Sequence, residues 1–382
     1  MKVLIIDLSG KVTSYDEALY EAVKTQSCTE VSLVAPDLVK GDAGVIHLLS
    51  LIPSKIKYTE NPIKRVVKAI EGLLNYVYLL FLCIKRKPDV LHFQWFPFME
   101  VCSVDIIFVK ILRALRHDLK LVLTVHNVFP HNLSMQRKRR YKERFMKMSN
   151  VVDHYIAHTE SSKDEIAREF GLSSDRIDVV PHGIFTPDFQ PKDNVNISDE
   201  YKIIMYGNNL PYKGADILLD AVQLLPEELK KKIKVTIVGA TSNDFLELLK
   251  EKSDGLHVSF NPTFVPDDEL YTLIDEADYI ALPYKRITQS GVLLLALYFR
   301  KPLLISDLPS FVDTLHGFTS DMFFKSEDAA SLKDLIQRHI EGKVDTTIQK
   351  KAIEELNELY SWHNSAIKTI EVYNTLNSDI GN

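Results

Sequence analysis

The sequence has few cysteines, no long uncharged apolar run and neither of the common phosphate-loop motifs. Three cysteines among 382 residues, Cys28, Cys83 and Cys102, share no metal-ligand spacing, which argues against a disulfide framework and indicates reduced thiols in a cytosol. No run of about eighteen uncharged apolar residues occurs, so we expect no transmembrane helix. The stretch 1–7 reaches a carboxylate after four apolar residues, which predicts a strand and not a signal peptide.

The end of that first strand also lacks a nucleotide-binding signature. It continues as Asp7-Leu8-Ser9-Gly10-Lys11, which is neither Gly-x-Gly-x-x-Gly nor the eight-residue loop that ends in Gly-Lys-Ser/Thr. Dinucleotide and nucleoside-triphosphate binding therefore lose their best sequence marker.

What is present indicates two α/β domains. Hydrophobic residues make up 46% and charged residues 26%, and 382 residues are too many for one ordinary core. Short apolar runs alternate with helical stretches along the chain, which is typical of parallel βαβ units. The net charge of −6 divides into +5 over residues 1–185 and −11 over the remainder. This asymmetry indicates an anionic partner for the first half, or simply uneven solvated surfaces.

The stretch 281–304 predicts strand, loop, helix and strand. Its apolar run ends at Pro283, a polar turn follows from Tyr284 to Ser290, and helix-forming residues run from Val292 to Lys301. The turn places Thr288, Gln289, Ser290 and Gly291 at a helix N-terminus, where unpaired N–H groups and the helix dipole favour an anion. It is a candidate phosphate or diphosphate site, although Ser290 as an ordinary helix cap explains the same pattern.

Two further positions follow predicted strands. His126 comes directly after the run Leu121–Val125, where open α/β sheets bind ligands, and His131 lies five residues later in the same loop. Lys213 precedes a predicted helix after the strand Lys202–Tyr206, at the same sheet edge as the 284–291 turn, where it could neutralise a diphosphate.

Two helical stretches raise the question of a membrane. The apolar positions between Ile63 and Leu82 fit a buried core helix better than one lying on a membrane surface. The stretch 135–148 carries seven basic residues against one acid, with apolar side chains on one face. This pattern suits an anionic membrane or a phosphorylated lipid, with Arg137, Arg139, Arg140 and Arg144 as contacts, whereas a plain solvated helix is the alternative.

Four motifs in this order together resemble glycosyltransferase family 4, the retaining sugar-nucleotide transferases of GT-B fold. They are His126–Pro130, Val180–Gly183, Gly207–Gly214 and Leu282–Val292, and Tyr360-Ser361-Trp362 is similar to the family's ending. The resemblance implies an α/β protein with two doubly wound Rossmann-like domains facing each other across a cleft. The expected divisions are an acceptor-side domain at 1–186, a nucleotide-sugar domain at 187–360 and a helix at 361–382 that crosses back to the first domain.

The resemblance also assigns roles to residues. Lys213 matches the lysine that contacts the donor diphosphate, and His126 matches the histidine beside the donor sugar, so these two are the expected catalytic residues. The implied donor site has twelve members: Ser9, Gly10, Gly207, Asn208, Lys213, Gly239, Tyr284, Thr288, Gln289, Ser290, Gly291 and Val292. No metal and no cofactor is expected.

The chain departs from the family at its charges. Asn208 stands where the family has an arginine, and the stretch 287–296 lacks the usual pair of glutamates, as in a Gln-Ser-Gly-Val branch associated with bacterial surface polysaccharides. Lys285 or Arg286 could supply the missing charge or simply face solvent.

These features predict a retaining hexosyltransferase that uses a nucleotide diphosphate sugar and a glycan or lipid-linked acceptor. It would be cytoplasmic, with peripheral attachment to the inner face of the plasma membrane, and would bind no nucleic acid. The alternatives are an inactive GT-B protein that binds a nucleotide or a partner transferase, and a GT-B epimerase.

Overall fold

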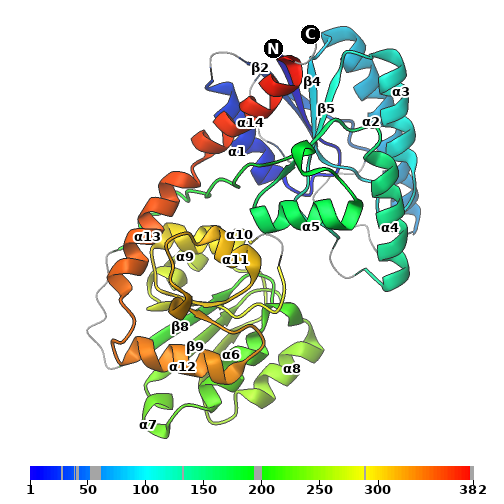
Figure 1. Ribbon diagram of the computed structural model, residues 1–382. Helices are drawn as coiled ribbons and strands as arrows, with labels where there is room; N and C mark the ends of the chain where they lie inside the picture. The colour runs from blue at the N-terminus through cyan, green and yellow to red at the C-terminus, as the bar shows by residue number, and fades with distance from the viewer. Residues whose placement is uncertain are drawn as a thin grey trace. The chain divides into compact units, whose positions relative to one another are not determined.

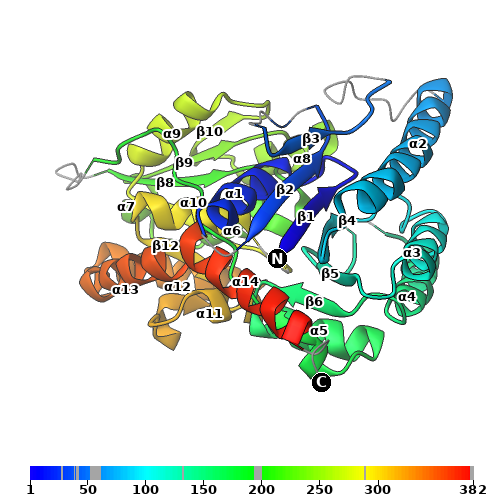
Figure 2. The same cartoon turned by 90° about the horizontal axis from the view of Figure 1, so that it is seen from above.

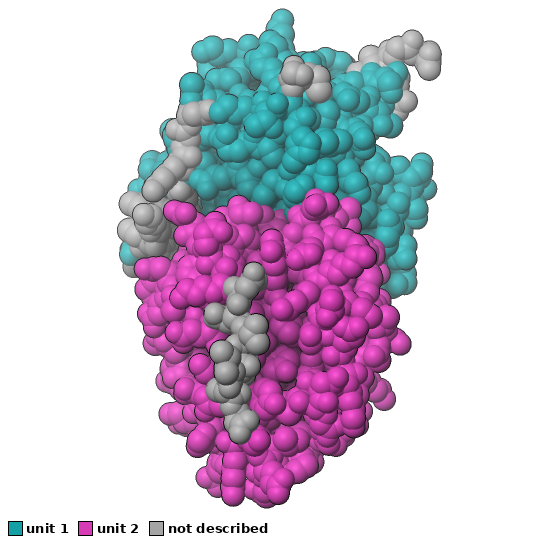
Figure 3. Space-filling model, turned by 90° about the vertical axis from the view of Figure 1, so that its left-hand side faces the viewer, with its two compact units in different colours: residues 1–183, 360–382 teal, residues 184–359 magenta. Residues whose placement is uncertain are grey.

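A computed structural model describes residues 1–26, 29–37, 39, 43–51, 62–130, 133–192, 200–287 and 290–378. The chain divides into two compact units (Figure 3). Unit 1 contains residues 1–183 together with 360–382, and unit 2 contains residues 184–359. Each is described separately below.

Unit 1 is built on a seven-stranded sheet in which every neighbouring pair is parallel. The strand order is β3-β2-β1-β4-β5-β6-β7, so the order reverses between β1 and β4. Carboxyl ends of parallel strands meet at one edge, and such a reversal is where open α/β sheets bind ligands. The strands are β1 (Lys2–Asp7), β2 (Glu30–Ala35), β3 (Val45–His47), β4 (Val90–Trp95), β5 (Lys120–Thr124), β6 (His154–Ala157) and β7 (Ile177–Val179).

Helices cover both faces of this sheet, and apolar side chains fill the space on each side. The last helix, α14, packs against α1 although the two are more than 330 residues apart in sequence. Figure 1 shows these two helices on one side of the sheet and α2, α3 and α4 on the other. The helices of unit 1 are α1 (Thr13–Lys24), α2 (Pro62–Arg86), α3 (Val104–Leu115), α4 (Met135–Met148), α5 (Glu160–Phe170) and α14 (Trp362–Ser378).

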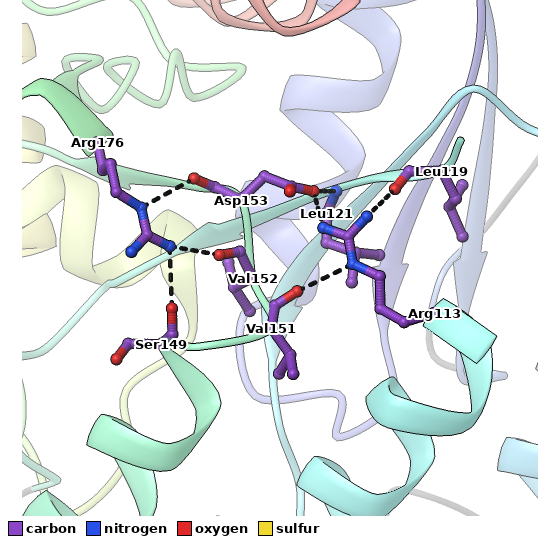
Figure 4. A network of polar contacts seen from close by, with 8 residues as sticks. All are labelled: Arg113, Leu119, Leu121, Ser149, Val151, Val152, Asp153 and Arg176. Atoms are coloured by element: carbon purple, nitrogen blue, oxygen red, sulfur yellow. Dashed lines mark hydrogen bonds and ion pairs between the residues drawn. The ribbon is translucent and has the colours of Figure 1, made fainter. Parts of the chain in front are cut away.

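Two arginines hold the amino-terminal edge of this sheet (Figure 4). The Arg113 guanidinium, from α3, donates to the carbonyls of Leu119 and Val151 and pairs with the Asp153 carboxylate. The Arg176 guanidinium donates to the carbonyls of Ser149, Val152 and Asp153. These hydrogen bonds satisfy backbone carbonyls beside the ends of α3 and α4, so the network is structural.

Unit 2 repeats the plan with a six-stranded parallel sheet in the order β10-β9-β8-β11-β12-β13, reversing between β8 and β11. The strands are β8 (Tyr201–Tyr206), β9 (Ile233–Val238), β10 (His257–Asn261), β11 (Tyr279–Leu282), β12 (Leu303–Ser306) and β13 (Phe323–Phe324). The helices are α6 (Ala215–Gln223), α7 (Glu227–Lys230), α8 (Asn243–Lys252), α9 (Asp267–Asp275), α10 (Gly291–Phe299), α11 (Pro309–Thr314), α12 (Ala329–Ile340) and α13 (Thr346–Leu359). The prediction of two doubly wound Rossmann-like domains is confirmed.

The prediction that the 63–82 helix lies buried in the core is wrong for one of its faces. Glu71, Asn75 and Tyr76 on the inner face of α2 are buried, but Val66, Ile70, Val77, Phe81 and Ile84 are each between 48 and 64% exposed. By length and composition alone α2 could also cross a membrane, whereas the sequence analysis predicted no transmembrane helix. Periodic spacing shows that a helix has an apolar stripe but does not show what covers that stripe.

Candidate functional site

The loops after β8 and β11 meet at the strand-order reversal of unit 2, and glycines allow them to touch. A Cβ at Gly214 would lie 1.8 Å from the Pro283 carbonyl oxygen, and a Cβ at Gly239 would lie 2.3 Å from the Gly207 oxygen. All three glycines also have positive φ, between 76 and 122°, which L side chains rarely adopt. Because Gly239 follows β9, the glycines fix close contacts of the loop after β8 with the loops after both β11 and β9.

Gly207 brings three predicted donor-site residues together. A Cβ built on it would lie 3.1 Å from both the Lys213 Nζ and the Val292 Cγ2, so the lysine and the start of α10 converge on this glycine. The Tyr206 hydroxyl donates to the Val292 carbonyl at 2.9 Å and fixes the helix start against β8. Gly207, Lys213 and Val292 are thus assembled at one place in unit 2.

Lys213 is the unusual group of this site. It is only 8% exposed, and burial lowers its pKa from 10.5 to about 8. Its ammonium lies 5.4 Å from the Tyr284 ring centroid. Within residues 200–287 and 290–359, the Lys213 ammonium makes neither an ion pair nor a hydrogen bond. A buried cation without a counter-charge is costly, which points to an anionic ligand.

The start of α10 lies beside this lysine. The Ser290 side chain accepts from the Leu293 N–H at 3.2 Å and caps the helix, as expected for an ordinary N-cap. The N–H groups of Gly291 and Val292 belong to the first turn, where the helix dipole is positive. Thr288 and Gln289 lie outside the described residues.

Three serine hydroxyls hold the backbone of the turn after β11. The hydroxyls of Ser306 and Ser326 donate to the Tyr284 carbonyl at 2.9 and 3.0 Å, and the Ser310 hydroxyl donates to the Ile287 carbonyl at 3.2 Å. These positioning residues were not predicted. They lie 22 to 42 residues beyond the carbonyls that they bind, and no local pattern connects them to the turn.

The expectation that Lys285 could supply the missing positive charge is wrong in this structure. Its Nζ pairs with the Asp216 carboxylate at 2.8 Å, so its charge is already neutralised. The Arg286 guanidinium lies 5.8 Å from the Tyr212 ring centroid, and Asn208 is exposed and uncharged. Asn209 instead is buried, and its amide donates to the Gly239 carbonyl and the Thr241 hydroxyl at 3.1 Å.

In unit 1, His126 belongs to a buried histidine cluster, defined here as His92, His126, His158 and His182. The Nδ1–H of His158 donates to the Val180 carbonyl at 2.9 Å, so its neutral Nε2 accepts from His126 Nδ1 at 3.2 Å. His126 Nε2 lies 3.2 Å from the Gln94 side-chain oxygen. His92 contacts the hydroxyls of Tyr373 and Thr124.

Burial keeps these imidazoles neutral. It lowers the pKa of His92 and His182 to about 3 and that of His158 to about 4, and His158 lowers the first two further. The pKa of His126 is also far below its ordinary value, chiefly through burial and then through His158. Because burial keeps the ring neutral and its Nδ1–H is donated to His158, His126 is arranged to orient a neighbouring group and not to exchange a proton with one. His131 lies outside the described residues.

Three of these histidines follow successive strands. His126 comes after β5, His158 after β6 and His182 after β7, so the sheet brings them to one edge. The Tyr15 ring packs against His126 and His182 with centroids 4.7 and 4.8 Å apart. Only His126 was singled out from the sequence, although the same position after a strand could have identified the other two.

The β1 loop contributes a buried carboxyl pair. The backbone N–H and the hydroxyl of Ser9 both donate to the same Asp7 carboxylate oxygen, each at 2.8 Å. Gly10 has a φ of +68°. Asp16 on α1 is fully buried, and its pKa is well above 3.8, first because of burial and then because of Asp7. The Ser9 hydroxyl is thus already engaged with Asp7.

A small pocket opens beside His126 between the ends of β4 and β5. Gln94, Trp95 and Asn127 contribute polar groups, and Met99 and Phe145 form part of an apolar wall. Phe145 belongs to α4, whose side chains Tyr141, Phe145 and Met148 are buried in the core, with Phe145 stacked on Phe170.

The predicted basic contacts on α4 differ in their surroundings. Arg137, Arg139 and Arg140 are exposed, whereas the Arg144 guanidinium donates to the carbonyls of Met99 and Glu100 at 2.6 and 2.7 Å. Arg144 therefore holds the loop after β4, and the other three remain on the surface.

Comparison with known proteins agrees with this geometry. Residues 188–356 match the family model "Glycosyl transferases group 1", and residues 33–186 match "Glycosyltransferase Family 4". A D-inositol 3-phosphate glycosyltransferase from Rhodococcus jostii is 26% identical over 145 residues. That match takes in 34% of this chain and only 32% of the relative's length.

Solved structures resemble almost the whole chain at low identity. Sucrose-phosphate synthase from Thermosynechococcus elongatus has a TM-score of 0.72 and 16% identity, and covers 99% of both chains. HepE from Anabaena, in complex with UDP and glucose, has a TM-score of 0.67 and 14% identity, covering 98% of this chain and 100% of that one. The two halves of the chain thus match two glycosyltransferase family models, and its fold is that of the GT-B glycosyltransferases.

Proposed function

We propose that the protein is a retaining glycosyltransferase that moves a hexose from a nucleotide diphosphate sugar to a glycan or a lipid-linked acceptor in bacterial surface polysaccharide synthesis. The observation that carries this proposal is the buried ammonium of Lys213, which lacks a counter-charge among the described residues and lies beside the start of α10. A diphosphate would supply that counter-charge. HepE, which has the same fold, binds UDP and glucose.

In this proposal the chain itself stabilises the leaving group. The acceptor hydroxyl attacks the anomeric carbon on the face from which the diphosphate departs, and its proton passes to a diphosphate oxygen. As the bond from the anomeric carbon to the diphosphate breaks, negative charge grows on the phosphate oxygens. Lys213 and the N–H groups of Gly291 and Val292 would meet that charge, in place of a bound metal ion. His126, fixed by its hydrogen bond to His158, would orient the sugar or the acceptor.

A panel of UDP- and GDP-sugars, with detection of released nucleotide diphosphate, tests the proposal. We expect turnover with one donor and its loss in Lys213→Met. Lys301→Met is the matched control, because Lys301 is also 8% exposed in unit 2 but its Nζ contacts the Asp275 carbonyl at 2.6 Å. Equal activity of Lys213→Met and the parent protein would remove Lys213 from the site.

The second candidate is a GT-B protein that binds a nucleotide without turnover. The observation in its favour is the charge at the turn, since Asn208 carries none and Lys285 is paired with Asp216. Thermal shifts with UDP and GDP distinguish the two: stabilisation by a nucleotide without release from any donor sugar favours the binding protein.

A further inference from the structure

The outer surface of α2 and α3 is an apolar face on unit 1, and we call it the α2–α3 face. On α2 it contains Ile63, Val66, Ile70, Leu73, Leu74, Val77, Phe81 and Ile84, and on α3 it contains Ile107, Ile111 and Leu115. Each of these side chains is at least 43% exposed. The face has no charged side chain on α2 between Glu71, which is buried, and Lys85. A continuous apolar surface of this extent is unusual on a protein that meets only water.

The two helices lie side by side, so their exposed side chains form one surface. The rings of Tyr76 on α2 and Phe108 on α3 are 4.1 Å apart and join the helices below the face. Figures 1 and 2 show α2, α3 and α4 in succession on the same side of the unit 1 sheet. Along α2 the face runs for about 27 Å, from Val66 to Ile84, at 1.5 Å per residue. It is therefore broader than the narrow seam of a two-stranded coiled coil.

Charge at the edges of this face indicates its partner. Lys64, Arg65 and Lys68 lie in the first two turns of α2, where Lys68 pairs with Glu71, and Lys85, Arg86 and Lys87 lie at or directly after its end. The acidic side chains of the two helices, Glu71 and Asp105, are both buried. An apolar surface bordered by cations, without an exposed carboxylate on either helix, fits the acyl region and anionic headgroups of a membrane surface.

A second copy of the chain fits this surface less well. A two-fold parallel pairing of α2 would place each basic end against itself, and an antiparallel pairing would place the 64–68 cluster against the 85–87 cluster. Both arrangements oppose cations to cations, and these two helices expose no carboxylate to compensate. Charge complementarity therefore favours an anionic lipid surface.

The helix cannot leave the protein to span a bilayer without breaking its inner contacts. Glu71 accepts from the Leu51 N–H and Asn75 from the Leu49 N–H, both at 2.8 Å, and Asn75 donates to the Leu49 carbonyl at 3.0 Å. Leu79, Leu82 and Cys83 are buried in the core. Such a helix lies on a membrane with one face embedded.

We propose that unit 1 docks on an anionic membrane surface through the α2–α3 face. The apolar side chains of α2 and α3 enter the boundary between headgroups and acyl chains, and the basic clusters at the two ends of α2 bind anionic headgroups. This docking site differs from α4, whose apolar face of Tyr141, Phe145 and Met148 is buried, which leaves Met135 and Met146 as its exposed apolar side chains. The exposed arginines of α4 could add only a salt-sensitive attraction.

Flotation with vesicles of phosphatidylcholine, alone or mixed with phosphatidylglycerol, tests the proposal on the full chain. We expect the parent protein to float with the mixed vesicles. The triple variant Ile70→Ser, Val77→Ser, Phe81→Ser should bind them at least tenfold less. Its matched control is Ile348→Ser, Val312→Ser, Phe264→Ser, which removes the same three residue types from exposed positions of unit 2 and should bind like the parent protein.

Two further variants separate the contributions of charge. Arg65→Gln, Lys85→Gln, Arg86→Gln should weaken binding to mixed vesicles and remove the preference for them over neutral ones. Arg137→Ser, Arg139→Ser, Arg140→Ser on α4 should retain most of the binding. If the α4 variant loses binding while the α2 variants keep it, the docking site is α4 and the proposal is wrong.

Other outcomes would also overturn it. Failure of the parent protein to float with mixed vesicles, or equal flotation of the α2 triple variant, would exclude the α2–α3 face as a membrane site. Light scattering after gel filtration tests the other occupant: a parent dimer that becomes monomeric in the α2 triple variant would make the face a subunit interface. Thermal melting of each variant verifies that it is folded. No donor sugar is present, so these results are independent of whether the protein transfers sugar.

Discussion

Lys213→Met should make the protein more stable and weaken donor binding at the same time. Burial lowers the pKa of Lys213 from 10.5 to about 8, so at neutral pH the folded protein holds a charged ammonium that its surroundings disfavour. At about 1.4 kcal/mol per pKa unit, this difference costs the folded state about 3 kcal/mol at pH 7. Methionine has a similar length and no charge, so the substitution should recover much of that free energy.

The pH dependence of this effect has a definite sign. Because the folded pKa lies below the unfolded one, the full cost is present below about pH 8. It disappears as the pH rises from about 8 to 10.5, where the folded lysine is already neutral and the unfolded one is not. The stability gain of Lys213→Met, measured by urea unfolding, should therefore be largest at pH 7 and shrink above pH 8.

Binding should change in the opposite direction. A cation that contacts a diphosphate contributes roughly 2–4 kcal/mol, so turnover efficiency should fall about 30- to 1,000-fold. In the parent protein, donor affinity should be constant below about pH 8 and fall up to tenfold per pH unit above it, because only the protonated lysine binds the anion. Initial rates of nucleotide diphosphate release measure the turnover efficiency, and isothermal titration with the donor identified by the activity panel measures the affinity.

The control Lys301→Met should give the reverse pattern. Its Nζ contacts the Asp275 carbonyl, so removing it should destabilise the fold and leave donor affinity unchanged. If Lys213→Met instead destabilises the protein and binds donor normally, Lys213 is an ordinary structural lysine and the reasoning fails.

Three further predictions concern the backbone and the buried acids and bases. Gly214→Ala should cost more than 2 kcal/mol in urea unfolding, since its Cβ would meet the Pro283 oxygen, whereas Gly255→Ala, at φ +74° with no atom within 4 Å, should cost only about 1–2 kcal/mol. Asp16→Asn should raise the melting temperature increasingly as the pH rises above about 4, because the folded protein must keep Asp16 protonated beside Asp7 while the unfolded chain ionises it. The urea midpoint of unit 1, followed by the fluorescence of its two tryptophans, should fall as the pH is lowered from 6.5 to 5. The reason is that the histidines of the cluster become protonated in the unfolded chain but stay neutral in the folded protein. An unchanged midpoint would contradict burial of those neutral rings.

Much of the unit 2 site could be predicted because parallel strands place their carboxyl ends at one edge. Gly207 and Lys213 follow β8, and Ser290 and Val292 follow β11, so the two motifs needed only neighbouring strands to meet. Doubly wound order makes the first strand of the domain a neighbour of the fourth. Local sequence and one fold rule were therefore sufficient for this part.

Other features depend on partners distant in sequence and could not be predicted. Lys285 is neutralised by Asp216, 69 residues earlier, and a serine 42 residues beyond Tyr284 holds that residue's carbonyl. The outward face of α2 is a further example: its spacing is the same whether a core or a lipid covers it. Only the positions of the other elements show that this stripe faces away from the sheet.

The remaining charges at the turn explain why the site should depend so heavily on one residue. Asn208 is uncharged at the position where the family that the sequence resembles has an arginine, and Lys285 forms an ion pair with Asp216. Lys213, from the loop after β8, and the first N–H groups of α10 are the positive groups that converge on Gly207. A helix terminus contributes only about half an elementary charge. Arg286 is the other cation of this turn, but it is exposed and lies over the Tyr212 ring, so substitution of Lys213 removes the buried cation of the site.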